Sequence, residues 1–339
     1  MKLLRITIAF AAAALLAGGC VKSYVEQGGG DAIGFRAGSM LLQDDADYPT
    51  KASPMEADFR VFGRRNATNL VFNGDVVTYS AGAWTYSPLR FWWWDHASDY
   101  YDFVGAAPVS NTAAAALQGD AEITTVKVPY NASSDSYDLV MAATRILGTA
   151  PNPRAPVELE FNHMLSKVSV VVENTSDSPQ ALHLDNYYFR RLVTSGNAKA
   201  SFNDLNQGVL SWSDIVRANI NLGSVFPDTD IAAAGSYPGA SAMMIPQRLD
   251  TSPGGAGKPQ LVVNYRYTPV GESVEETKMA EIDLDTITRT PGGSDAIVLW
   301  EKGVHYTYTI RIRIGGDVRV NIVTTEWDVD YAETPGLLI

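Results

Sequence analysis

The sequence predicts an all-β protein made of two antiparallel β-sandwiches in tandem. Near the C-terminal end, apolar residues occupy every second position from Tyr306 to Ile314, with polar residues between them. Such a period of two buries one face of a strand and exposes the other. From residue 57 onwards, short strand patterns alternate with turn residues, and long helical patterns are scarce. The length of 339 residues suggests two domains, at about 100–200 residues each.

The first 20 residues have the order of a bacterial export signal. Lys2 and Arg5 give a basic start, an apolar run covers residues 6–16, and small residues precede Cys20, the only cysteine. This ending resembles the lipoprotein signal, in which the cysteine is lipidated and becomes the new N-terminus. We expect a signal peptide over residues 1–19 and a lipid anchor on Cys20. The alternative is an ordinary signal peptide, since Ala17 stands where the lipoprotein pattern usually has leucine.

A leader is expected over residues 20–36, because the glycines at 28–30 give it little to pack. In the first half, strand patterns cover residues 70–72, 76–79, 83–86, 89–94, 100–104, 125–130 and 138–143. Asn73-Gly74 predicts a hairpin turn between the first two of these. Prolines at 151, 153 and 156 exclude a central strand there. We therefore place a domain boundary at this point, between an N-terminal sandwich (37–155) and a C-terminal one (156–339).

The second half begins with a strand pair or bent strand over residues 157–173, which places Val168, Val170 and Val172 on one face. Further strand patterns cover residues 182–189, 209–212, 242–246 and 261–267. The last hairpin joins residues 305–314 to 318–322 through the turn at 315–317.

Composition excludes several classes of function. The formal net charge of −12 repels phosphate backbones, so we expect no nucleic-acid partner. The four histidines are far apart in the sequence, and neither a His-Glu-x-x-His nor a Gly-x-Ser-x-Gly motif occurs. We expect His163 to be a packed core histidine. We predict no cofactor, no metal site and no enzymatic activity; a β-sandwich hydrolase would need two carboxylates facing each other across a cleft.

Several short motifs follow one another along the chain. They are Ile33-Gly34-Phe35-Arg36-Ala37, Tyr100-Tyr101-Asp102-Phe103, residues 138–142, residues 157–168, Ile245-Pro246-Gln247, and Trp300, Gly303, Tyr306, Tyr308 and Trp327. In this order they resemble the fimbrillin family, the pilus subunits of Bacteroides-like bacteria. The resemblance implies export as a lipoprotein, two transthyretin-like β-sandwiches, and trimming of an N-terminal segment by an arginine-specific protease. A strand from the next subunit then fills the opened groove.

Carried onto this chain, the resemblance implies cleavage after Arg36, which leaves Ala37 first and removes Ile33 and Phe35 as a plug. The alternative is that Arg36 is a surface arginine, and Arg60, Arg64 and Arg65 are competing sites. The donor strand would be Leu337, Leu338 and Ile339, although this apolar triplet is short and follows Pro335-Gly336. A shaft, anchor or tip role therefore stays open.

The implied partners are other copies or paralogous fimbrial subunits, the processing protease, a host or bacterial surface ligand, and the outer membrane through the lipid on Cys20. The implied location is the cell surface. Asp285-Thr286-Ile287 also resembles the Bacteroides O-glycosylation pattern.

Trp92, Trp93 and Trp94 lie in one of the predicted strands, which would place Trp92 and Trp94 on one face and Trp93 on the other. We expect core packing on at least one face. Exposed tryptophans would instead stack on sugar rings or make an adhesive contact. This gives the alternative function, a lipid-anchored surface glycan-binding protein that does not assemble.

Overall fold

The structure is a computed structural model that describes residues 31–39, 53–54, 57–118, 124–177, 181–221, 228–251, 257–289, 293–315 and 318–326. The predicted all-β class is confirmed, since the one helix among these residues is the single 3₁₀ turn η2 (Leu284–Thr286). Cys20 and residues 337–339 lie outside the described residues. No helix of the described part has the length and apolar character needed to cross a membrane.

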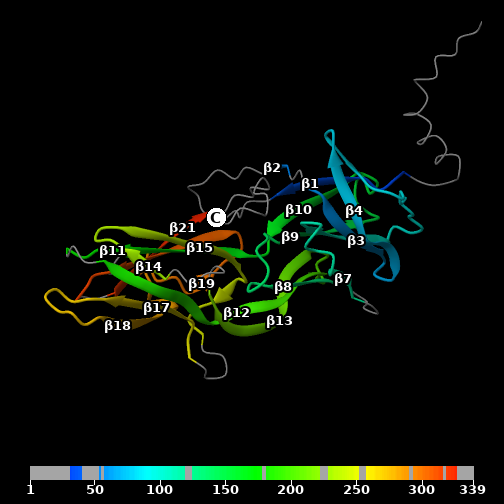
Figure 1. Cartoon of the computed structure of the whole chain (residues 1–339). Helices are drawn as coiled ribbons and strands as arrows, with labels where there is room; N and C mark the ends of the chain where they lie inside the picture. Colours follow the sequence, from blue (N-terminus) through cyan, green and yellow to red (C-terminus); the bar gives the residue numbers. More distant parts are fainter. Residues whose placement is uncertain are drawn as a thin grey trace, which may run out of the picture.

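The first sheet has eight strands and occupies one end of the molecule (Figure 1). Their spatial order is β2 (Ser53–Pro54), β1 (Phe35–Ser39), β10 (Val157–His163), β9 (Val140–Leu147), β6 (Tyr100–Ala107), β3 (Phe59–Arg65), β4 (Asn69–Ser80) and β5 (Ala83–Thr85). β10 follows the expected boundary between residues 155 and 156, yet it pairs with β1 and β9 of this sheet.

Two further sheets, of four and seven strands, face each other at the other end of the molecule. The four-stranded sheet has the order β15 (Ser236–Met244), β11 (Ser166–Asn174), β20 (Val304–Ile312) and β21 (Val318–Glu326). The seven-stranded sheet contains β18 (Glu276–Asp283), β17 (Gln260–Tyr267), β12 (Leu182–Phe202), β8 (Val126–Asn131) and β7 (Ala116–Leu117), with β13 (Gly208–Ile220) and β14 (Thr229–Ile231) also paired to β12. A two-stranded ladder joins β16 (Gln247–Arg248) to β19 (Leu299–Trp300).

These two sheets enclose an apolar core in a sandwich-like arrangement. The predicted face of Val168, Val170 and Val172 is fully buried there. From the opposite sheet, the ring of Phe189 lies 5.7 Å from that of Tyr308, centroid to centroid. The alternation predicted for the last hairpin is confirmed, because every second side chain from Tyr306 to Ile312 is buried.

Strand β12 connects the two ends of the molecule. Its first half contributes Leu184 and Phe189 to the sandwich core. Its second half contributes Ala198 and Phe202 to a different cluster, which also includes Phe62 from the first sheet. The long green strand in Figure 1 therefore packs in two cores and joins them.

Two ladders depart from the predicted antiparallel pairing. β1 runs parallel to β10, and β11 runs parallel to β20. Parallel neighbours cannot be joined by a tight hairpin. Each of these pairs is separated by more than 100 residues, as Phe35 opposite Val157 shows. The period of two fixes which face of a strand is buried, but it does not fix the strand's direction.

The hairpin predicted at Asn73-Gly74 is wrong. These residues lie inside the continuous strand β4, where Gly74 has φ of +84°. The register moves from Val61–Asp75 to Phe62–Asn73, so Gly74 is the extra residue of a β-bulge. A glycine with positive φ serves a bulge as well as it serves a turn.

Candidate functional site

The segment 31–39 lies at an edge of the first sheet and is held there by its backbone. The Ile33 amide donates to the Arg90 carbonyl at 2.9 Å, and the Val157 amide donates to the Gly34 carbonyl at 2.8 Å. From Phe35 onwards, β1 pairs with β10. On its other side, β2 pairs only with Gly38 and Ser39. Within the described ranges, the first part of β1 therefore has one strand neighbour. It belongs to the fold although residues 31–36 fall in the expected leader.

The apolar side chains of this segment are part of the apolar core of the first sheet. Ile33 is 1% exposed and Phe35 is 5% exposed. Four rings from separate segments surround Phe35 at centroid distances of 5.5 to 6.0 Å, namely Phe59, Phe72, Tyr86 and Phe103. The Tyr86 hydroxyl also donates to the Ile33 carbonyl at 2.7 Å. Burial of one such side chain contributes about 1.5–3 kcal/mol.

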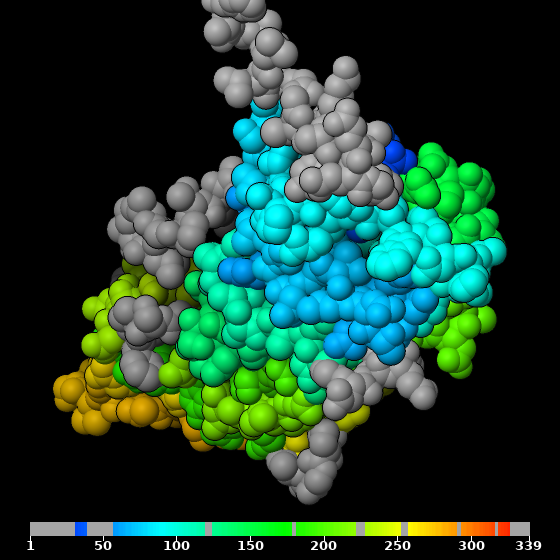
Figure 2. Space-filling view, turned by 90° about the vertical axis from the view of Figure 1, so that its right-hand side faces the viewer, coloured from blue at the N-terminus to red at the C-terminus, as the bar shows by residue number. Residues whose placement is uncertain are grey.

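Arg36 points the opposite way from its neighbours. Its side chain is 70% exposed and lies 3.6 Å from the Glu158 carboxylate, which is equally exposed. An exposed ion pair of this kind contributes about 0–1 kcal/mol. Figure 2 looks onto the light-blue and cyan residues of the first sheet, and part of the dark-blue segment 31–39 reaches the surface at their upper edge. The buried Phe35 and the exposed Arg36 are thus adjacent in one strand.

The competing arginines of β3 are tied to the fold. Arg60 donates to the carbonyls of Val109 and Gly74, and Arg64 donates to those of Ala67 and Gln118. These bonds hold both guanidinium groups against the protein, in contrast to Arg36.

The three consecutive tryptophans lie in the connection between β5 and β6 rather than in the predicted strand. Trp92 is 2% exposed and stacks on Trp94, with ring centroids 5.6 Å apart. Trp93 faces the other way and is 67% exposed. Trp92 and Trp94 therefore lie on one side and Trp93 on the other, as expected, although these residues do not form a strand. Of the three rings, that of Trp93 is the one exposed to solvent.

A network of polar contacts fixes the ring of Trp93. The Arg65 guanidinium lies 5.3 Å from the ring centroid and bonds to Asp95 and Asp99. The indole N–H donates to the Asp95 carboxylate at 2.6 Å. Hydrogen bonds from Asn66 and then Arg65 lower the pKa of the buried Asp99 carboxyl. The exposed ring is therefore held in one orientation before any ligand arrives.

His163 is the packed histidine that the sequence predicts. It is buried, and its Nδ1 lies 2.8 Å from the Asp138 carboxylate.

The sequence did not indicate which aromatic rings surround Phe35. Phe59, Phe72, Tyr86 and Phe103 come from β3, β4, the β5–β6 connection and β6, and no spacing relates them. The motif containing Ile33 and Phe35 does mark two side chains that the structure buries; their role as a plug stays a prediction.

Sheets of eight, seven and four strands make up most of the described part of the chain. The chain belongs to the fimbrillin-like family, whose model matches residues 50–327. The predicted resemblance is thereby confirmed. Comparison with curated proteins finds no match.

Comparison with solved structures finds similar proteins at low sequence identity. A fimbrial protein from Bacteroides vulgatus is 16% identical, with a TM-score of 0.50 and coverage of 88% of this chain and 99% of that one. A Bacteroides uniformis protein to which cell adhesion is ascribed is 17% identical (TM-score 0.46, coverage 88% and 98%). The fimbrial anchor protein Mfa2 from Porphyromonas gingivalis is 11% identical (TM-score 0.39, coverage 88% and 98%). At 16% identity, the similarity to the Bacteroides vulgatus protein shows a shared fold and nothing more.

Proposed function

We propose that this protein is a structural subunit of a cell-surface fimbria. In this proposal it is exported as a lipoprotein through Cys20, matured by cleavage after Arg36, and joined to other subunits by β-strand donation. The observation that carries the proposal is the buried pair Ile33 and Phe35, which fills an edge groove next to the exposed Arg36. Family membership supports the fimbrial role, with other fimbrial subunits as partners.

Cleavage between Arg36 and Ala37 would open the groove at a defined place. It would remove Phe35 from its four aromatic neighbours and leave Val157 of β10 without its strand partner. An uncovered sheet edge beside an apolar groove pairs readily with another chain. A donor strand with apolar residues at alternate positions restores both the backbone bonds and the ring contacts. Repeated head to tail, this contact builds a filament.

The proposed donor is the C-terminal triplet Leu337, Leu338 and Ile339. The proposed arrangement of the whole chain is two transthyretin-like domains in tandem, with adhesion as the role of the assembled fimbria. A chain whose tail cannot donate would serve as an anchor or tip.

The test is digestion of the purified, unlipidated protein, beginning at Val21, with an arginine-specific protease. Unheated denaturing gels should show a ladder of oligomers whose N-terminus is Ala37. The Arg36→Ala variant should stay uncut and monomeric, whereas Arg154→Ala, which changes another exposed arginine, should behave as the wild type. A cleaved protein that stays monomeric would overturn the shaft role.

A second candidate function rests on Trp93, whose exposed ring is fixed by Asp95 and Arg65. Fixed tryptophan rings stack on sugars at low entropic cost. On a glycan array, binding that is lost in Trp93→Ala and kept in the exposed-surface control Leu205→Ala would support surface glycan recognition. An array without any bound glycan would contradict it.

A further inference from the structure

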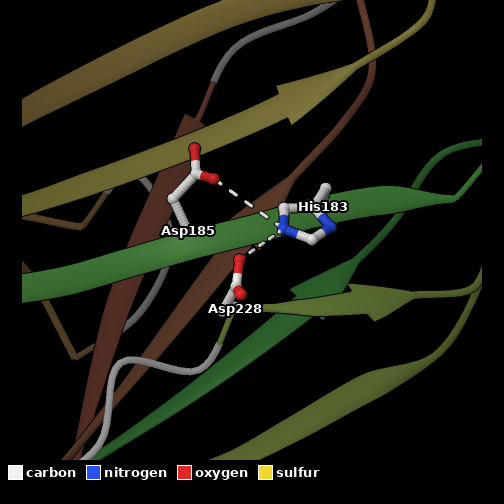
Figure 3. A group of neighbouring side chains, drawn as sticks. All are labelled: His183, Asp185 and Asp228. Atoms are coloured by element: carbon white, nitrogen blue, oxygen red, sulfur yellow. Dashed lines mark hydrogen bonds and ion pairs between the residues drawn. The ribbon is translucent and has the colours of Figure 1, made fainter.

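A cluster of one histidine and several carboxylates lies in the other half of the molecule (Figure 3). His183 lies on β12, directly opposite Asp230 of β14 on one side and Arg266 of β17 on the other. Asp185 lies two residues further along β12, where a bulge breaks the register with β17. Asp228 precedes β14. Three separate segments therefore meet around the imidazole.

The ligand atoms have the separations that a shared metal ion requires. The Nε2 atom of His183 lies 3.0 Å from an Asp228 oxygen and 3.8 Å from an Asp185 oxygen. These three side chains offer ligand atoms that all lie within 4.8 Å of one another. Around a tetrahedral ion with bonds of about 2.0–2.2 Å, neighbouring ligand atoms are roughly 3.3–3.5 Å apart. The His183–Asp228 and His183–Asp185 separations lie on either side of this range, and Asp228, the most exposed of the three side chains, is the one that can adjust most freely.

The surrounding groups orient these ligands. The Nδ1 atom of His183 lies 2.7 Å from the Asp230 carboxylate. A metal-bound histidine commonly donates its second ring N–H to a carboxylate in this way, which leaves Nε2 for the metal. Arg266 donates from Nε to Asp185 at 2.7 Å and from Nη1 to Glu275 at 3.0 Å. Arg266 thus bonds to the same Asp185 oxygen that faces His183 Nε2, and its Nη2 lies 3.9 Å from the Asp228 oxygen. The guanidinium therefore adjoins the ligand atoms and fixes the Asp185 carboxylate.

The charge of the cluster favours a cation. Asp185, Asp228, Asp230 and Glu275 bring four negative charges, and Arg266 brings one positive charge. Both ring nitrogens of His183 face carboxylates. With a protonated His183, the net charge of these four carboxylates, Arg266 and the imidazole is −2. A divalent ion that replaces the proton at Nε2 brings the sum to −1.

We propose that His183, Asp185 and Asp228 bind a divalent transition-metal ion, with Zn²⁺ as the best match. Imidazole nitrogen suits Zn²⁺, whereas Ca²⁺ takes six to eight oxygen ligands. Three protein ligands leave a fourth position for water or for a group from another molecule. His183 and Asp185 are each about one quarter exposed, and Asp228 is largely exposed. Of these three ligands, His183 also borders a hollow that Asp230, Arg266 and Glu275 line. An ion therefore reaches them directly from solvent.

The experiment is isothermal titration of Zn²⁺ into tag-free, metal-stripped protein beginning at Val21. We expect one Zn²⁺ per chain, and at least tenfold weaker binding in His183→Gln and in Asp228→Asn. Asparagine tolerates the positive φ of 37° at position 228, so the second variant keeps the backbone. The controls His96→Gln and Asp204→Asn change exposed residues of the same types elsewhere and should bind as the wild type.

A second measurement follows the coordination itself. Co²⁺ in the same site should give visible absorption that Zn²⁺ displaces and that excess Ca²⁺ leaves unchanged. Absence of stoichiometric Zn²⁺ binding, or equal binding by the wild type and both ligand variants, would overturn the proposal. Its outcome is independent of fimbrial assembly, since neither Arg36 nor the groove takes part.

Discussion

At the scale of single residues, Phe35 carries more of the proposed function than any other side chain described. It contacts rings from four separate segments, while its neighbour Arg36 is largely exposed and forms an ion pair with the exposed Glu158. Substitution by alanine at these two adjacent positions should therefore have very different effects on the free energy of unfolding.

The Phe35→Ala substitution should lower the free energy of unfolding by about 3–5 kcal/mol, because it leaves a cavity among aromatic rings. Urea denaturation measures this change. Arg36→Ala should stay within about 0.5 kcal/mol of the wild type. Equal stabilities for the two variants would mean that the segment does not plug the groove in solution.

Asp99, which lies beside the loop of Trp93, makes the stability of the protein depend on pH. Its carboxylate accepts hydrogen bonds from Asn66, from Arg65 and from two backbone amides, and these bonds lower its pKa. A group whose pKa is lowered by folding stabilises the protein above its unfolded pKa of about 4, and this stabilisation is lost as the pH falls.

The Asp99→Asn variant should therefore lose less stability than the wild type between about pH 4 and pH 2. Denaturation at a series of pH values gives, for the wild type and for Asp99→Asn, the slope of the unfolding free energy against pH. The exposed-surface control Asp204→Asn should keep the wild-type slope. Parallel slopes for wild type and Asp99→Asn would show that Asp99 does not titrate as its contacts imply.

At the scale of elements, the turns that begin and end β4 do not use the Asn73-Gly74 pair from which the sequence predicts a hairpin. The connection between these strands uses Asn66 and Ala67 at positive φ, and the turn after β4 uses Ala81 and Gly82. The Asn-Gly pair in the middle of β4 forms a bulge instead, because both of its flanks pair with β3.

Replacement of Gly74 by alanine should destabilise the protein by about 1–2 kcal/mol, since its φ of +84° is unfavourable for a side chain. A methyl group there would also lie 3.2 Å from the Phe62 ring. Gly82→Ala is the matched control, with the same sign of φ and open space around it. Thermal unfolding should rank Gly74→Ala as the less stable variant, and the reverse order would contradict the tight bulge.

At the scale of the whole molecule, the two ends are joined by close contact as well as by the shared strand β12. The first residue of β13, Gly208, lies against Ala143 of β9 in the first sheet. The Arg145 side chain of β9 bonds to the buried Asp102 and reaches Asn206, just before β13. The first sheet and the β12–β13 hairpin therefore pack as one body.

The Gly208→Ala substitution should weaken this contact, because the added methyl group would lie only 2.2 Å from the Ala143 carbonyl oxygen. We expect a loss of about 1–3 kcal/mol, typical of overpacking. Gly34→Ala meets only ordinary contacts with Pro156 and should be nearly neutral. Denaturant melts of both variants test this, and a neutral Gly208→Ala would mean that the two ends separate easily.

The sequence by itself determined the all-β class, the buried faces of β11 and β20, and the family to which the chain belongs. These features follow from local alternation or from motifs read in order, and neither depends on which strands become neighbours. Tertiary structure alone decided that β10 joins the first sheet, that four distant rings enclose Phe35, and that His183 meets Asp228. Strand partners are chosen by the burial of apolar faces contributed from all along the chain, and no local pattern records that choice.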